Sequence, residues 1–184
     1  MYTGAISMRY AKALLAYTNE AKVEYAVYQQ ALTLERSFRE VPALRAAMEN
    51  PVLPQEEKIK VLVAASGGKV SPELERFFRL VMQQRRERCL PAMIRNYIAL
   101  YRKQENISIG KLTTAVPMAL KEVERIRKIV VDHTGGSAEF STKVDPDIEG
   151  GFIFEIGTYR LDASVANQIR RIKQQFIEKN RRIV

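Results

Sequence analysis

The sequence predicts an α+β protein, with an N-terminal six-helix bundle over residues 1–105 and a small β-α-β-β-β-α domain over residues 106–184. Up to about residue 105, apolar residues recur every three or four positions, which is typical of helices that bury one face. Beyond that point they alternate in short runs bounded by glycine and proline, which is typical of strands. A chain of 184 residues is long enough for two small domains with real cores.

The first three helices are predicted from apolar spacing and from proline. Ser7 is the expected N-cap of the first helix. A second helix is expected over 22–40, and a short third one over 42–49 ends at Asn50-Pro51, because the residue before a proline avoids the helical region. One face of the first helix carries the apolar or small residues Ile6, Tyr10, Ala13, Leu14 and Tyr17.

Helices four to six have clear start and stop signals. Pro54 opens the fourth helix, with Glu56-Glu57 favourable to the helix dipole, and Gly67-Gly68 ends it. Ser71-Pro72 starts the fifth helix, and the sixth is expected near 90–105. The inward residues expected for the fifth helix are Leu74, Phe77, Phe78, Val81 and Met82.

The second half alternates strands with helices. A strand is expected over 107–116, with Gly110 as a candidate bulge and Pro117 as its end. Leu120, Val123, Ile126 and Val130 mark a helix that stops at Gly135-Gly136, and a second strand is expected over 138–144. These signals predict the β-α-β part of the domain.

The run VDPDIEGGFIFEIGTYRLDASV, residues 144–165, predicts a turn, a hairpin and a terminal helix. Phe152, Phe154 and Ile156 alternate on one side of a strand, and Gly157-Thr158 allows a tight reversal. Asp162 or Ser164 is the expected cap of the last helix. The apolar stripe of that helix is Val165, Ile169, Ile172 and Phe176.

The chain offers few groups for catalysis. His133 is the only histidine and falls in the last turn of a predicted helix, where a structural role is typical. Cys89 is the only cysteine, which excludes an intramolecular disulfide. Gly67-Gly68-Lys69 lacks the spacing of a phosphate-binding loop and follows a helix. We therefore expect a protein that is not an enzyme and that uses no cofactor and no metal.

The net charge of +9 leaves two interpretations open. A basic protein binds RNA or another acidic partner in some cases, but a charge excess spread over both halves is more typical of a solvated surface. The alternative to a structural subunit is thus a basic, RNA-associated α+β protein, whose binding would fall steeply with salt. No apolar run is long enough to span a membrane, and the N-terminus lacks a secretory signal pattern.

Four stretches together resemble the delta subunit of bacterial F-type ATP synthase, the family of the mitochondrial oligomycin-sensitivity-conferring protein. They are RYAKAL at 9–14, NPVLPQEEK at 50–58, Arg86 or Arg88 followed by Leu90, Ile94 and Tyr97, and the run at 144–165. Glu149 departs from the pattern, since the family often has an aliphatic residue before the paired glycines. The resemblance covers nearly the whole chain.

The resemblance implies a monomeric stator subunit, one copy per complex, that ties the catalytic head to the peripheral stalk and so resists rotor torque during proton-driven ATP synthesis. The implied partners are the N-terminal helix of an alpha subunit and the C-terminal helices of the b subunits, with no nucleic acid. The membrane is reached only indirectly, which implies a peripheral protein on the cytoplasmic face of the bacterial inner membrane.

Two binding surfaces follow from the same resemblance. In the family, a groove between the first and fifth helices receives the alpha-subunit helix. In this sequence that role falls on Tyr10, Ala13, Leu14, Phe77 and Val81. The stalk surface is expected on the terminal helix at Val165, Ile169 and Phe176, which would otherwise be buried against the sheet.

Overall fold

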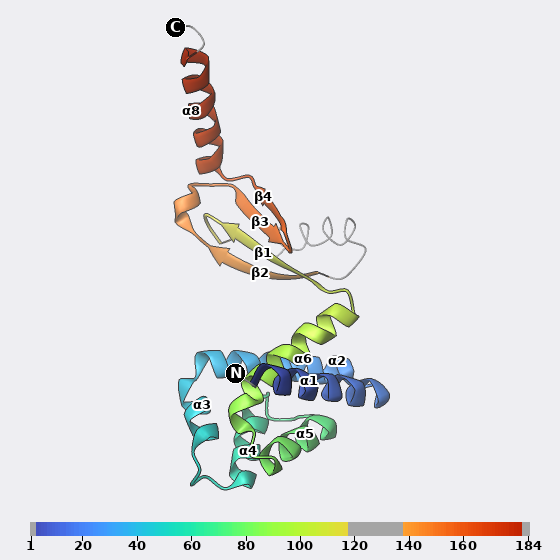
Figure 1. The fold of residues 1–184 in the computed structure, drawn as a ribbon. Helices are drawn as coiled ribbons and strands as arrows, with labels where there is room; N and C mark the ends of the chain where they lie inside the picture. The colour runs from blue at the N-terminus through green and yellow to red at the C-terminus, as the bar shows by residue number, and fades with distance from the viewer. Residues whose placement is uncertain (1–2, 118–137, 182–184) are drawn as a thin grey trace. The chain divides into compact units, whose positions relative to one another are not determined.

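The structure is a computed structural model that describes residues 3–117 and 138–181 (Figure 1). Its internal contacts divide the chain into two compact units, Met1–Gln104 and Glu105–Val184. The first unit is helical and the second combines a sheet with a helix. The predicted α+β fold class is therefore confirmed.

The first three helices lie close to their predicted positions. Helix α1 spans Thr3–Glu20, α2 spans Glu24–Glu40 and α3 spans Pro42–Glu49. The predicted start of the first helix was wrong, because α1 begins a full turn before Ser7. Ser7 lies inside the helix and is fully buried, so it is not the N-cap.

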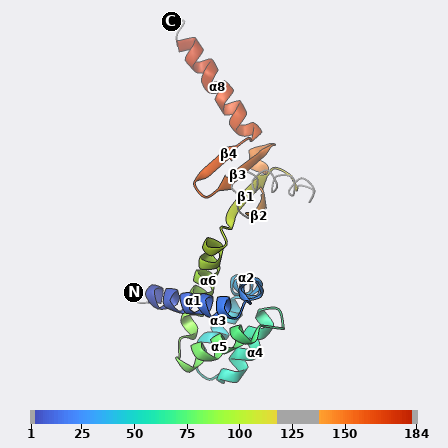
Figure 2. The same ribbon diagram turned by 90° about the vertical axis from the view of Figure 1, so that its right-hand side faces the viewer.

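Figure 2 shows the remaining helices of the first unit, of which the fourth and fifth follow their predicted proline and glycine signals. Helix α4 spans Gln55–Ala65, α5 spans Pro72–Gln83 and α6 spans Leu90–Gln104. A short 3-10 turn, η1, covers Glu87–Cys89 between the last two. Gly67 and Gly68 both have positive φ after α4, a conformation that glycine adopts at no steric cost.

Helix α6 is the centre of the first unit and packs against both α1 and α2. The fully buried Tyr97 joins all three, since its hydroxyl donates to the Glu24 carbonyl at 3.1 Å and lies 3.4 Å from Thr18 Oγ1. Burial raises the pKa of Tyr97 to about 12. Tyr101 stacks on Tyr28 with ring centroids 4.3 Å apart. The end of α6 is thus tied to its neighbours by specific polar and aromatic contacts.

The second unit contains a four-stranded sheet in the order β2-β1-β3-β4. The strands are β1 Ser108–Thr114, β2 Ala138–Val144, β3 Phe152–Ile156 and β4 Tyr159–Asp162. Strands β1 and β2 are parallel, whereas the other two pairings are antiparallel. A parallel pair needs a crossover connection, but the helix predicted around Leu120–Val130 lies outside the described residues, as does His133.

Gly110 does not form the predicted bulge. It pairs in continuous register with Phe140 on β2 and with Ile156 on β3. A Cβ at this position would come within 2.5 Å of the Phe140 ring and 3.2 Å of the Phe154 ring. Gly110 therefore makes room for two phenylalanine rings over the strand.

The predicted turn, hairpin and cap are all present in the run at 144–165. Asp145 accepts a hydrogen bond from the Asp147 N–H at the start of a 3-10 turn, η2, over Pro146–Ile148. Ile156 pairs with Tyr159 across the two-residue turn. Ser164 Oγ accepts from the Asn167 N–H at 3.2 Å, and caps the terminal helix α8, Val165–Arg181.

Asp162 and Gly151 hold the start of α8 in place. The Asp162 carboxylate accepts hydrogen bonds from the Ser164 hydroxyl at 2.6 Å and from the Ser164 N–H at 3.1 Å, and these bonds lower the pKa of Asp162. Gly151 has φ +74°, and a Cβ there would collide with the Ala163 carbonyl oxygen. The segment before β3 therefore contacts the segment before α8 backbone to backbone, with no side chain between Gly151 and Ala163.

Candidate functional site: the seam between α1 and α5

Helices α1 and α5 lie side by side and run in opposite directions. The Tyr10 and Phe77 rings meet edge to face, with centroids 6.4 Å apart. Nearly two turns further along α1, the Tyr17 hydroxyl accepts a hydrogen bond from Arg76 Nη1 at 2.8 Å. The guanidinium of Arg86, just after α5, lies over the Tyr10 ring at 5.6 Å. These contacts define the α1–α5 seam as a continuous line on the surface of the first unit.

The five predicted groove residues divide into a floor and a rim. Leu14, Phe77 and Val81 are buried, and Val81 has no exposed surface at all. Tyr10 is half-buried, and Ala13 is exposed. The seam therefore has an apolar floor that already belongs to the bundle core, and only Tyr10 and Ala13 of the predicted set can touch an incoming partner directly.

The structure adds rim residues that the groove prediction did not include. Tyr17 is 36% exposed and Leu80 is 45% exposed. Leu80 follows Arg76 by one turn of α5 and so lies on the same side of that helix as the Tyr17 contact. Ala13 and Tyr17 on α1 and Leu80 on α5 are therefore exposed small or apolar residues on the two helices of the seam. Apolar spacing alone placed Tyr17 on this face of α1, but offered no signal for Leu80.

The segment after α5 is held by bonds that fix its path. The Arg86 N–H donates to the Val81 carbonyl and the Arg85 N–H donates to the Met82 carbonyl, an arrangement that closes a helix C-terminus. Arg85 takes φ +51°, the left-handed conformation that glycine most often supplies here. The hydrogen-bonded end of α5 therefore fixes the backbone of Arg86 at the position from which its guanidinium reaches the Tyr10 ring.

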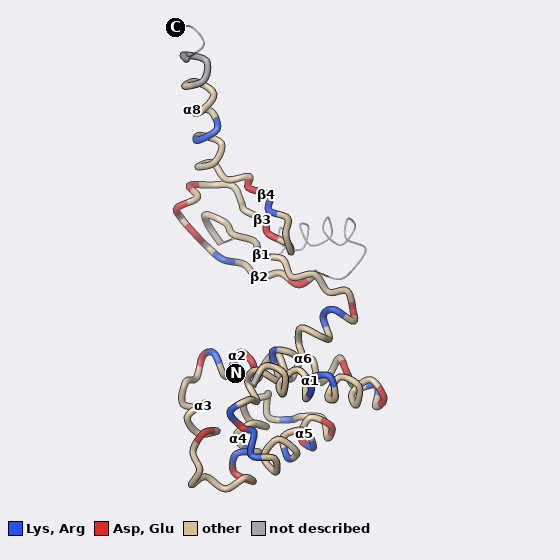
Figure 3. Tube along the Cα trace, in the orientation of Figure 1, with Lys and Arg blue, Asp and Glu red and all other residues tan. Residues whose placement is uncertain are grey.

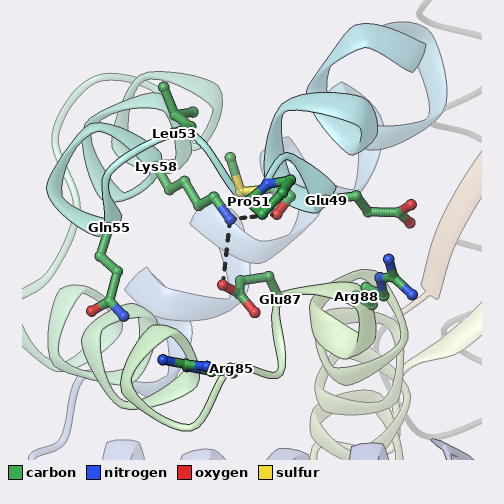
Figure 4. A pocket seen from close by; sticks show the side chains of 9 residues that line it. Glu49, Pro51, Leu53, Gln55, Lys58, Arg85, Glu87 and Arg88 are labelled. Carbon is green, nitrogen blue, oxygen red and sulfur yellow. Dashed lines mark hydrogen bonds and ion pairs between the residues drawn. The ribbon is translucent and has the colours of Figure 1, made fainter.

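A recess of about 380 Å³ at the junction of α3 and α4 is lined in part by this segment, through Arg85 and Glu87 (Figure 4). Lys58, with a side chain only 5% exposed, donates to the Met48 carbonyl at 2.8 Å and pairs with Glu87 Oε1 at 3.3 Å. Lys58 ends the stretch NPVLPQEEK that the sequence singled out. That stretch thus supplies the cation that anchors η1 to α3 and α4.

The predicted stalk residues are all exposed on α8, as is every residue from 168 to 177. Val165 is 39% exposed, Ile169 54% and Phe176 65%. Ile172 and Ile177 on the same helix are 52% and 49% exposed. The alternative that this stripe is buried against the sheet does not hold for these side chains. An apolar face of this length is unusual on a protein surface unless something binds it.

Charged residues occur along the described parts of both units. Figure 3 shows acidic and basic positions mixed along the backbone trace of each unit. Within residues 3–117 and 138–181, no group of three or more His, Cys, Asp and Glu side chains is placed to hold a metal. Cys89 is a half-buried free thiol. No helix in this part of the chain is long and apolar enough to cross a bilayer.

An apolar seam in one unit and exposed apolar side chains on a helix of the other are surface features typical of a protein that binds other proteins. Comparison with known proteins identifies its family. The model of the ATP synthase delta (OSCP) subunit family matches residues 6–176. ATP synthase subunit delta of Phocaeicola vulgatus is 63% identical over 185 residues, covering 100% of both chains. The protein of the same name from Parabacteroides distasonis is 39% identical over 178 residues, covering 97% of this chain and 99% of that one.

A solved structure supports the fold independently. A chain in a cryo-EM structure of the Toxoplasma gondii mitochondrial ATP synthase hexamer superposes with a TM-score of 0.65, covering 93% of this chain and 97% of that chain at 18% identity. The chain described here belongs to the ATP synthase delta (OSCP) subunit family. It is a non-catalytic, stator-linking subunit, and the RNA-binding alternative is not supported.

Proposed function

We propose that this subunit links the catalytic head to the peripheral stalk through the two surfaces described above. The α1–α5 seam receives the N-terminal helix of an alpha subunit, and the apolar face of α8 contacts the C-terminal helices of the b subunits. One copy serves each complex. These partners hold the subunit at the cytoplasmic face of the bacterial inner membrane, where it resists rotor torque during proton-driven ATP synthesis.

The exposed Ala13 at the centre of the seam is the observation that carries the head contact. A docking helix approaches closely where a small side chain lies between larger apolar ones. Ala13 lies between Tyr10 and Tyr17 along α1, and Leu80, one turn after Arg76 on α5, adds an exposed apolar side chain. The buried floor of Leu14, Phe77 and Val81 holds the two helices at a fixed separation, so the surface is formed before the partner arrives.

The exposed stripe on α8 supports the stalk contact. Val165, Ile169, Ile172 and Phe176 recur at helical spacing over three turns. Helices of a stalk offer a long surface, and an amphipathic helix pairs with such a surface through residues at this spacing. The stripe belongs to the second unit and the seam to the first, so one chain carries two separate contact surfaces.

Calorimetric titration of the full chain with a peptide of the alpha subunit's first ~20 residues, about 30 Å when helical, tests the head contact. Ala13→Arg places a long charged side chain in the seam and should weaken binding about tenfold or more, since a hot-spot truncation or clash costs more than about 1.4 kcal/mol. Helix content by circular dichroism should not change.

Ala99→Arg is the matched control, because Ala99 is an exposed alanine on α6 outside the seam. It should bind the peptide as the unmodified chain does. Equal affinity of all three proteins would remove Ala13 from the site, and no binding by any of them would refute the proposed head contact.

A further inference from the structure

Two arginine side chains contact the two tyrosines of the seam. Arg86 lies over the Tyr10 ring, and Arg76 donates to the Tyr17 hydroxyl. Tyr10 and Tyr17 are seven residues apart on α1, a rise of about 10.5 Å or nearly two turns. The seam therefore carries one guanidinium next to Tyr10 and one next to Tyr17, and these two tyrosines are about two helical turns apart along α1.

Arg76 and Arg86 differ from their neighbour Arg79, because in the part of the chain that the structure describes only the charge of Arg79 is neutralised by ion pairs with carboxylates. Arg79 pairs with Glu56 and Glu75, both at 3.0 Å, on the side of α5 that faces α4. Neither Arg76 nor Arg86 makes an ion pair with a carboxylate among the described residues. The Tyr17 hydrogen bond is the main influence that raises the pKa of Arg76, and the nearby Glu73 carboxylate adds a smaller one.

The position of Arg86 is fixed by its surroundings. The backbone bond from Arg86 to Val81 holds it against the end of α5. Its neighbour Glu87 is held by the buried Lys58, which also donates a hydrogen bond to the Met48 carbonyl (Figure 4). A guanidinium on a fixed segment loses little conformational freedom when it binds, so its contact with a carboxylate is stronger than that of a mobile surface arginine.

We propose that Arg76 and Arg86 each bind a carboxylate of the helix that docks in the seam, and that these two acidic residues are seven positions apart on that helix. The inference deepens the proposed head contact and rests on it. The apolar centre of the seam supplies affinity, whereas the two cations select an acidic helix and fix its register. The guanidinium fork matches a carboxylate in geometry as well as in charge.

The test uses the full chain and three designed helical peptides of ~20 residues, each about 30 Å long. They share one apolar face, and differ in two positions at its edge: Glu at seven-residue spacing, Gln at the same positions, or Glu at four-residue spacing. The seven-residue Glu peptide should bind about threefold to tenfold more tightly than either of the others. Raising the salt to about 0.5 M should reduce that difference.

Arg76→Gln and Arg86→Gln identify the cations involved. Each should lose about threefold in affinity for the seven-residue Glu peptide and nothing for the Gln peptide, because only the first peptide carries the charge that it pairs with. Arg79→Gln, on the same helix but already paired, should bind all peptides as the unmodified chain does. An equal loss for the Glu and Gln peptides would mean that the arginines only support the packing of the seam, and would overturn the inference.

The alpha-subunit peptide of the previous section is titrated in parallel. If it binds while the designed peptides and the arginine variants show no charge preference, the charge inference fails and the proposed head contact stands. If the alpha-subunit peptide does not bind, both fail together. Charge-dependent binding that is lost in Arg76→Gln and Arg86→Gln supports both.

Discussion

The described parts of the two units differ in how far they bury their apolar side chains. Among the described residues, twenty-two of the twenty-four buried apolar side chains belong to the first unit, and only Leu112 and Ile148 belong to the second. All five residues of strand β3 are only half-buried. On α8, five large apolar side chains are at least 39% exposed.

This difference indicates how each unit meets its partner. The first unit has a closed core, and its seam is a shallow surface over side chains that are already packed. The second unit has exposed apolar side chains along a helix. A partner that covers them gains a binding free energy of about 25 cal/mol for each Å² of apolar surface buried. We expect the first unit to bind as a preformed body and the second to gain order and stability from its contact.

A pair of truncations tests the comparison most strongly. Phe78 is fully buried in the first unit, and Ile169 is 54% exposed on α8. Phe78→Ala should lower the free energy of unfolding by about 3–5 kcal/mol because it leaves a cavity. Ile169→Ala should change it by less than about 0.5 kcal/mol. Urea unfolding followed by circular dichroism measures both, and a comparable loss in the two variants would show that α8 is packed in solution.

The buried ion pair gives an intermediate effect in the first unit. Lys58→Met leaves the Glu87 carboxylate without its cation, and should lower the free energy of unfolding by about 2–4 kcal/mol, somewhat reduced because Glu87 is partly exposed. Lys60→Met is the control on the same helix, since Lys60 is 72% exposed beside Glu57 and its loss should matter little. Similar urea midpoints for the two variants would argue against a structural role for Lys58.

The smallest effect is expected at the cap of α8 and depends on pH. The hydrogen bonds from Ser164 hold the pKa of Asp162 below its ordinary value of about 3.9. The ionised carboxylate therefore adds stability that is complete above that value and is lost as the pH falls through the lowered pKa. Asp162→Asn should show a weaker loss of α8 helicity between about pH 5 and 2. Identical acid titrations of the two proteins would remove Asp162 from the cap.

Most of the fold could be predicted because its boundaries depend on local backbone chemistry. Pro72, Gly67-Gly68 and Ser164 mark helix ends through φ restriction, positive φ and capping, and the structure places each where the sequence did. Ser7 and Gly110 were misassigned for the opposite reason. A buried serine inside a helix and a glycine that makes room for two rings are determined by tertiary neighbours, which residue spacing does not reveal.

The candidate site was predicted only in outline. Helical spacing predicted Tyr10, Ala13 and Leu14 on one face of α1, but it did not distinguish the exposed Ala13 from the buried Leu14. The exposure of Leu80 and the contact of Arg86 with Tyr10 depend on how α5 and the following segment cross α1. Those contacts join residues more than sixty positions apart, a distance over which a single sequence carries no signal.

The backbone geometry at Gly151 limits which substitutions this position accepts. Every single-base change of a glycine codon yields a stop codon, a synonymous codon or a residue that carries a Cβ. At this position any Cβ would strike the Ala163 carbonyl oxygen, and φ +74° strains an L residue in any case. The backbone contact between the segments before β3 and α8 therefore makes every missense change at this codon strain the local fold, whatever the chemistry of the replacement.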